Sequence, residues 1–389
     1  MVCPGNPPGA SRGTITYSWH GLALTVSMSH YNHKFLLCYV IFSRIQKNNG
    51  EGKIIKPNLN CERIAAAFLA SLLSLLTVPT HAQSNQGLVS SREVVDQRED
   101  GSGAFRTNCL ESHDSYDDPL VFPNQPAATH HHIFFGNPTV NADTTITSLQ
   151  ETQQTTCDGG TLNQSAYWVP ALYDAYGERI AYVDPLFYYK TGYHVPAASI
   201  QPPPPGLRMI AGNAMARSPQ STQVAKFRCA SWQSNQAWFD PGDPLDHVPY
   251  IPNCAIDDLV EIRIVFPQCW DGVHLDSPDH QRHMAYPSEA SPPKAGTGAC
   301  PASHPIAIPE ISYNFVVYVT EDTGPSTLWR FASDMGGETL GGASLHGDWM
   351  NGWNTDIMAQ IVRNCLQAAQ ECGVGLLGDG RKLNPVVVD

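Results

Sequence analysis

The alternation of hydrophobic and polar positions after residue 104 predicts many short β-strands. Apolar or aromatic runs recur along this part of the chain, and each is bounded by Pro, Gly, Asn or Asp. The clearest run is residues 260–266, in which Glu261 and Arg263 alternate with apolar side chains, as in a strand with one buried face. Short strands separated by turn residues indicate a mostly β fold, with a sandwich or jelly-roll-like core and long loops.

One helix is expected near the C-terminus. Thr355 is a suitable N-cap, and Asp356 favours the positive end of the helix. Apolar residues recur at helical spacing until Gly373: Ile357, Ile361, Val362 and Leu366. This pattern favours a surface helix that packs on the sheet. The proline run at 202–205 is expected to be a loop within one domain, because cysteines lie on both sides of it.

The N-terminal part has the layout of a secretory signal. Arg63 precedes a short apolar run, 64–78, and Ala82 offers a cleavage site, so we expect a signal peptide at 61–82 and a secreted or periplasmic product. The run is too short for a stable membrane span. Residues 1–60 are then expected to be a non-native or disordered extension, with translation starting near Leu59; the competing interpretation is a type II membrane anchor. Residues 83–104 are predicted to be a flexible lead-in to a single domain, 105–389.

Eight of the eleven cysteines follow residue 82, and an even number behind an export signal predicts four disulfides that secure long loops. Within one continuous helix, Cys365 and Cys372 would be separated by a rise of roughly 10 Å, beyond disulfide reach. These two residues can pair only if the helix ends between them. The remaining connectivity is open for the other six: Cys109, Cys157, Cys229, Cys254, Cys269 and Cys300.

The formal net charge of −13 argues against nucleic acid as a partner, because phosphate binding needs clustered positive charge. An acidic surface is compatible with a soluble protein that binds cations or neutral glycans.

Three histidine-rich stretches carry the candidate chemistry. In an extended segment His130 and His132 point to one face and His131 to the other, so the first two could share a metal ion. The alternative is that they are hydrogen-bonded histidines that brace a loop. In the second stretch, Ser277 and Pro278 resemble the start of a helical turn, which would place His280 and His283 on one face.

The third stretch joins His346 and Asp348 to two tryptophans. Trp349 and Trp353, with Asn351 between them, are candidates to hold a sugar ring, because indoles cover its apolar face while polar groups bind its hydroxyls. The alternative is that both tryptophans belong to the core, and Trp270 poses the same choice.

Carboxylates near these histidines are candidate catalytic groups. A metal-free glycosidase needs only two carboxylates about 5 to 10 Å apart, and Asp276, Asp279 and Asp348 are candidates. The chain has no G-x-S-x-G, G-x-G-x-x-G, Walker or H-E-x-x-H motif.

Six motifs in order resemble a secreted family catalogued as a domain of unknown function, DUF1996, which in fungi often accompanies WSC modules. They are Asp118 to Pro123, Thr129 to Asn137, Phe266 to Gly272, Asp276 to His280 with His283 to Pro287, Cys300-Pro301 with His304-Pro305, and His346 to Trp353. The resemblance implies export, a disulfide-bearing domain and a histidine-rich site that includes His304. It supplies no reaction, and no WSC-like module is visible.

These observations favour a metal-assisted enzyme that acts on extracellular polysaccharide or cell-wall material. Zinc or copper would bind the histidines, and an aspartate from 276–279 would transfer the proton. The metal ligands are expected among His130, His132, His280, His283, His304 and His346. A non-catalytic glycan-binding or cell-surface module and a metal-free glycosidase remain the alternatives.

Overall fold

The computed structural model describes the backbone of residues 11–19, 22–31 and 34–44, and the whole of residues 87–192, 194–230, 247–288, 296–334 and 340–386. Residues 1–81 and 82–389 form two separate units. The first contains an antiparallel sheet in the order β1 (Ser11–Trp19), β2 (Leu22–Tyr31) and β3 (Lys34–Arg44). The predicted signal peptide, 61–82, lies outside the described residues.

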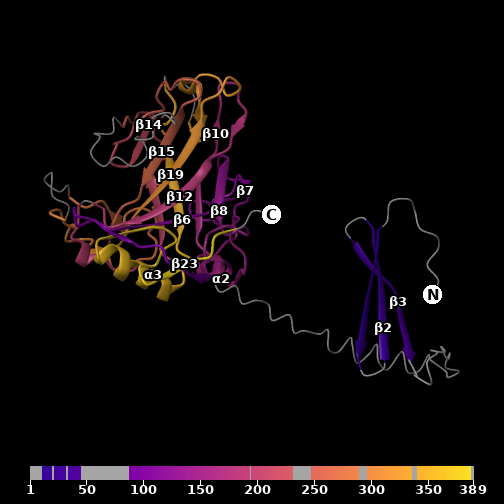
Figure 1. The fold of residues 1–389 in the computed structure, drawn as a ribbon. Coiled ribbons are helices and arrows are strands. Elements are labelled where there is room, and N and C mark those ends of the chain that lie inside the picture. Colours follow the sequence, from indigo (N-terminus) through magenta and orange to yellow (C-terminus); the bar gives the residue numbers. More distant parts are fainter. Residues whose placement is uncertain are drawn as a thin grey trace, which may run out of the picture. The chain divides into compact units, whose positions relative to one another are not determined.

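The second unit is built on two large sheets (Figure 1). The seven-stranded sheet runs β14 (Ala225–Ala230), β15 (Leu259–Val265), β19 (Glu310–Tyr318), β12 (Val183–Lys190), β6 (Ala104–Asn108), β22 (Gln370–Val374) and β5 (Asp96–Gln97). The five-stranded sheet runs β13 (Arg208–Gly212), β21 (His346–Met350), β9 (Ala166–Pro170), β8 (His132–Gly136) and β7 (Glu111–Ser115). Neighbouring strands are antiparallel except β22 and β6.

The main core lies between these two sheets, because each strand turns its alternate apolar residues inward. Val260, Ile262 and Ile264 of β15 are buried there, and Phe135 of β8 stacks on Phe315 of β19 with ring centroids 5.3 Å apart. Burying each such aromatic or aliphatic side chain contributes roughly 1.5–3 kcal/mol. The predicted β-sandwich is therefore confirmed.

A second, smaller core lies on the outer face of the five-stranded sheet. It contains Phe134 of β8, its cross-strand partner Trp168 of β9, and Met350 of β21, which pairs with Ala166 of β9, together with Leu120 and Leu149. Leu149 comes from the short helix α2 (Ile146–Glu151), capped by Thr145. The connection between β7 and β8 folds over this face and brings Leu120 onto it. Polar side chains on the same face are buried as a result.

The predicted C-terminal helix is present as α3 (Thr355–Ile361), with Asn354 rather than Thr355 as its N-cap. The chain continues as a π-helical turn over Val362–Gln367 and then enters β22. Because helical structure ends at Gln367, Cys365 and Cys372 can approach, and they form a disulfide with Cα atoms 5.8 Å apart. Figure 1 shows α2 and α3 at one end of the sandwich and β14 toward the other.

The predicted four disulfides are all present. Besides Cys365–Cys372, the structure joins Cys109 to Cys157, Cys229 to Cys254, and Cys269 to Cys300. Three of these bridges close loops of 25 to 48 residues, in keeping with the prediction that the bridges secure long loops.

Short elements complete the domain. Two minor sheets run β11 (Arg179–Ile180), β10 (Leu172–Tyr173), β20 (Arg330–Phe331), and β17 (Met284–Ala285), β16 (Cys269–Trp270), β18 (Ile306–Ala307). Within the predicted lead-in, β4 (Leu88–Ser90) pairs with β23 (Arg381–Leu383), and β5 pairs with β22. Among residues with described positions, no helix is both long and apolar enough to cross a bilayer.

Candidate metal centre

The sheet order brings two distant histidines together on its outer face. His132 of β8 pairs with Pro170 on β9, and Asp348 of β21 pairs with Trp168 on the same strand. In the same antiparallel register, His346, two residues before Asp348, lies opposite Pro170. Pro170 on β9 therefore lies between His132 on β8 and His346 on β21. Strands two apart in a sheet are about 9.6 Å from each other, a span that two imidazoles facing each other can close.

Three imidazole nitrogens converge above Pro170. The Nε2 atom of His346 lies 3.2 Å from Nε2 of His130 and 3.3 Å from Nε2 of His132. The rings of His130 and His132 lie with centroids 4.2 Å apart, as expected for alternate residues on one face of an extended segment. These three residues form a group whose ligand atoms all lie within 4.8 Å of one another. His131 points elsewhere, and its ring contacts Tyr173 and Tyr116.

Backbone carbonyls determine the tautomers of two of these histidines. Nδ1 of His132 lies 3.1 Å from the carbonyl oxygen of Asp117, and Nδ1 of His346 lies 2.9 Å from that of Ser344. A carbonyl oxygen only accepts hydrogen bonds, so each Nδ1 carries the proton and each Nε2 presents a lone pair. This is also how the outer nitrogen of a metal-binding histidine is usually held.

All three histidines are kept neutral. Burial, followed by the neighbouring His346 and His131, lowers the pKa of His130 to about 3. Burial lowers the pKa of His346 to about 4. Burial, followed by His130 and His346, holds the pKa of the fully buried His132 well below its usual range. Neutral imidazoles with free lone pairs are the form that transition metals bind.

Two buried carboxyl groups lie beside the histidines. Oδ2 of Asp348 is 3.8 Å from Nε2 of His346, and within the described residues neither oxygen of Asp348 has a hydrogen-bond partner. Burial, and then the nearby Asp118, raise the pKa of Asp348 well above its usual range. Burial also raises the pKa of Asp118 to about 6, against hydrogen bonds from the amides of Val121 and Leu120.

The geometry suits a small, nitrogen-preferring cation. Zinc–nitrogen bonds of about 2.0–2.1 Å in a tetrahedral site require ligand nitrogens about 3.3–3.4 Å apart. Two of the separations, 3.2 and 3.3 Å, fall close to that edge length, and the ligand atoms of all three histidines lie within 4.8 Å of one another. The unpaired carboxyl of Asp348 would be stabilised by a positive charge at the same place. The three histidines and Asp348 therefore fit a divalent transition metal.

Comparison with known families gives a match that spans this centre. The model of a domain of unknown function, DUF1996, matches residues 118–353. The chain belongs to the DUF1996 family. The matched region of this DUF1996 domain begins at Asp118 and includes His130, His132, His346 and Asp348. Searches of curated proteins and of solved structures find no similar chain.

Asp118 was not among the site residues proposed from the sequence. It opens the first family motif, where an Asp-Pro pair looks like ordinary turn chemistry. It is 4% exposed and lies close enough to Asp348 to raise the pKa of that carboxyl. The sequence signal that could have identified Asp118 as a site residue was its position at the start of the first family motif.

The structure does not bring the other proposed histidines into the triad. His280 has a left-handed backbone (φ 58°), so the expected helical turn does not form, and its Nδ1 contacts Asp276 at 3.0 Å. His283 uses both ring nitrogens, on the hydroxyl of Ser277 and the carbonyl of Arg208. His283 therefore braces a loop.

His304 lies in a turn away from the triad. Its Nε2 is 2.8 Å from the carbonyl oxygen of Arg282, and its Nδ1 is 2.9 Å from the hydroxyl of Ser303.

The two tryptophans of the third motif lie in the core. Trp349 is 0% exposed and Trp353 is 4% exposed, and Nε1 of Trp353 donates to the hydroxyl of Tyr189. Asn351 is also buried and donates to the carbonyls of Pro203 and Pro204. These rings have no free face for a sugar. Trp270 is half-buried and donates from Nε1 to the carbonyl of His274.

The remaining proposed aspartates form ion pairs near the surface. Asp276 contacts Arg208 at 3.2 Å, and Asp279 pairs with Arg282 at 2.7 Å. Hydrogen bonds, first from the amide of Arg282, hold the pKa of Asp279 well below its usual range. Neither group is in the position of a free base at the triad.

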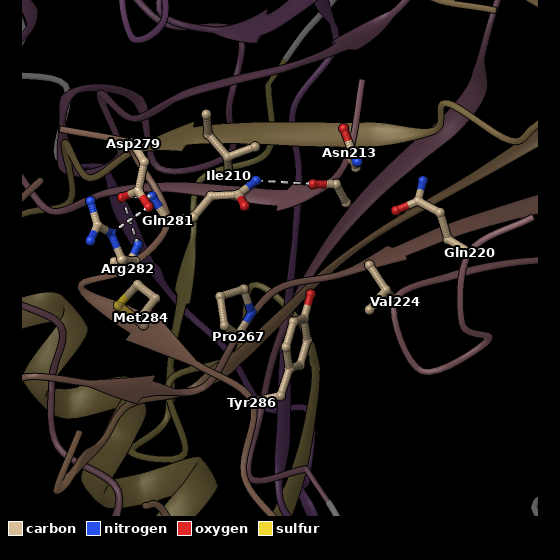
Figure 2. A pocket seen from close by; sticks show the side chains of 11 residues that line it. Ile210, Asn213, Gln220, Val224, Pro267, Asp279, Gln281, Arg282, Met284 and Tyr286 are labelled. Atoms are coloured by element: carbon tan, nitrogen blue, oxygen red, sulfur yellow. Dashed lines mark hydrogen bonds and ion pairs between the residues drawn. The ribbon is translucent and has the colours of Figure 1, made fainter. Parts of the chain in front are cut away.

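An open pocket of about 400 Å³ lies at β13, the strand next to β21. Figure 2 shows its amide side chains, Asn213, Gln220 and Gln281, above Pro267, Met284 and Tyr286, with the Asp279–Arg282 ion pair at one side. Gln220 also donates to the carbonyls of Ala343 and Leu345. These two residues flank Ser344, whose carbonyl oxygen accepts the hydrogen bond from Nδ1 of His346.

Proposed function

We propose that this DUF1996 domain binds a divalent transition metal, zinc or copper, through His130, His132 and His346, and that the centre acts on extracellular polysaccharide. The observation that carries the proposal is the contact between the Nε2 atoms of His132 and His346. Both atoms are lone-pair acceptors at 3.3 Å, so no hydrogen bond can join them. A shared cation removes the repulsion, and the lowered pKa values disfavour a proton in that role.

A metal bound by three histidines keeps an open position, where it can lower the pKa of a water molecule or polarise a substrate oxygen. The chain's own groups then have distinct tasks. His132 and His346 are buried and fixed by carbonyls, while His130 is partly exposed and leaves the side toward solvent open. Asp348, at 3.8 Å from His346, would accept a proton once a bound cation favours its ionised form, a task that the sequence had suggested for residues 276–279.

The pocket at β13 supports a sugar as the substrate. Gly212, in its wall, lies directly opposite His346 in the sheet, and Ile210 lies opposite Asp348. Cross-strand partners have Cβ positions about 4.5–5.5 Å apart, so the pocket wall adjoins the strand that carries the centre. Neutral amides over an apolar floor match a hydroxylated, uncharged ligand.

The same pocket favours a second candidate function, a glycan-binding module without catalysis. The two functions differ in their products. We expect purified protein, produced without a histidine tag and loaded with zinc or with copper, to release soluble fragments from one member of a panel of neutral cell-wall polysaccharides. Chelator-treated protein and the variant His346→Ala should release none, while His304→Gln should behave as the parent.

Three other outcomes are informative. Binding without fragments in the metal-loaded protein contradicts the enzymatic proposal and supports the module. Activity that survives chelation contradicts the role of the metal and supports a metal-free glycosidase. Neither binding nor fragments on any polysaccharide contradicts the proposed substrate.

A further inference from the structure

The outer face of the seven-stranded sheet carries a concentration of positive charge on an otherwise acidic chain. Lys226 and Arg228 project from the edge strand β14, and Arg263 projects from β15 beside them. Their strand neighbours Phe227, Ile262 and Ile264 are in the core, so alternation places the charged side chains on the opposite face. The net charge of the chain is −13, which makes such a group of cations unusual in its context.

The register of the sheet leaves one of these cations, Lys226, without an ion-pair partner among the described residues. Arg228 lies opposite Glu261 and pairs with it, and Arg263 also pairs with Glu261. Lys226 lies directly opposite Arg263, which is a like-charge pair. Within the described residues, the ammonium group of Lys226 has neither an ion pair nor a hydrogen bond, and burial, then Arg263 and Lys190, lower its pKa to about 8 against the opposing effect of Glu310 and Glu261.

Two further nitrogen atoms at this place lack partners. Nε of Arg263 and Nε2 of His247 are buried, and the described part of the chain offers neither a hydrogen-bond partner. His247 is held there because its neighbour Val248 forms a bridge with Phe227 of β14. Burial, followed by Arg263 and Lys226, lowers the pKa of His247 to about 4. Buried polar atoms without partners are rare in folded proteins, and each calls for an explanation.

We propose that Lys226, Arg263 and His247 bind an oxyanion, a phosphate or sulfate group. Such a group offers several acceptor oxygens to donors that come from different strands, and charge-assisted bonds of this kind are among the strongest hydrogen bonds in proteins. Its negative charge balances Lys226, which Glu310 and Glu261 influence from a distance without forming an ion pair with it within the described residues. This site is on the seven-stranded sheet and the histidine triad is on the outer face of the five-stranded sheet, so the two sites are independent.

The group can come from free phosphate or sulfate, or from a substituent on a charged polysaccharide. We therefore compare sodium sulfate, sodium phosphate and dextran sulfate by calorimetry and by thermal unfolding, at one ionic strength set with sodium chloride, with uncharged dextran as the control polymer. Wild-type protein is expected to bind at least one of these anions with a saturating rise in Tm. Binding of the small anions identifies a free-ion site, and binding of dextran sulfate alone identifies a polysaccharide substituent.

The variant Lys226→Met is expected to weaken anion binding at least tenfold. The matched control is Lys382→Met, because Lys382 pairs with Glu93 at the edge of β23 and belongs to no part of the cluster. His247→Gln supplies a second variant if Lys226→Met fails to fold, with a smaller loss expected. No saturable binding by the wild-type protein overturns the proposal, as does equal binding by the wild type and by whichever of these two variants folds.

Discussion

The Nε2 atoms of His132 and His346 lie 3.3 Å apart, although both imidazoles place their proton on Nδ1. Each Nδ1 faces a backbone carbonyl, from Asp117 and Ser344, and a carbonyl cannot donate a hydrogen bond in return. The two lone pairs therefore face each other in a buried position. The fold holds this arrangement through three adjacent strands, which supports the proposal of a pre-organised cation site.

Replacing Asp348 by Asn should weaken metal binding by about 10- to 100-fold, the usual effect of losing an outer partner of a metal site. The carboxyl is 1% exposed and, within the described residues, its oxygens have no hydrogen-bond partner, so a cation bound beside it would stabilise its ionised form and would in turn be stabilised by it. Competition titration with a chromophoric chelator measures the affinity. Asp276→Asn is the control, and equal affinities in the two variants would contradict this role.

Gly212 is expected to support His346 through the backbone. It lies opposite His346, its φ is +79°, and an added Cβ would be 2.4 Å from the carbonyl oxygen of Leu345. Gly212→Ala should therefore combine about 1–3 kcal/mol of backbone strain with a displacement of the strand that carries His346. Gly101→Ala is the matched control, because Gly101 has φ +76° and open space around its Cβ position.

Chemical denaturation and metal titration of both variants test this prediction. A loss of metal affinity is expected for Gly212→Ala alone. If both variants lose the same stability and neither loses affinity, the close approach to Leu345 has no consequence for the site.

The four disulfides should differ in their contributions to stability. Cys109–Cys157 spans 48 residues and Cys365–Cys372 spans 7. Loop-closure entropy then predicts about 4 kcal/mol for the first bridge and about 2.5 kcal/mol for the second. Urea denaturation of the two paired Cys→Ala variants measures both values. A larger loss from removing Cys365–Cys372 would show that chain entropy does not set the order.

Glu261 should contribute acid-sensitive stability. Burial opposes ionisation, but Arg263 and Arg228 hold the pKa of this carboxyl below its usual value. A depressed folded-state pKa stabilises the protein above the unfolded value, and that contribution disappears as the pH falls through the folded value. Glu261→Gln should therefore be less stable at neutral pH and should lose less stability than the parent between pH 5 and 3. Urea denaturation at each pH measures the free energy of unfolding. An equal loss of stability in both proteins as the pH falls would contradict this assignment.

Local patterns in the sequence predicted the elements that depend on local chemistry. The alternating run 260–266 corresponds to β15 (Leu259–Val265), and the helical spacing after Thr355 corresponds to α3. Alternation also paired His130 with His132. These predictions succeeded because side-chain periodicity acts over a few residues, although the N-cap of the helix is Asn354 and not the predicted Thr355.

The rest of the site depends on long-range pairing that local patterns do not encode. His346 reaches His132 only because β9 lies between β8 and β21. His280 and His283 have helical spacing, but the left-handed φ at His280 breaks the expected helical turn, and the two rings contact different partners. Asp118 meets Asp348 because the connection between β7 and β8 folds over the sheet, which no short motif indicates.

Metal content of the purified protein tests the central claim most directly. Protein produced without a histidine tag, incubated with zinc or copper and freed of loosely bound ions, should retain one metal per chain by elemental analysis. His132→Ala and His346→Ala should each retain almost none, while His283→Gln and His304→Gln, outside the triad, should retain one. Wild-type protein that retains no metal and shows no affinity in titration would contradict the account, and so would full retention by the His132→Ala or His346→Ala variant.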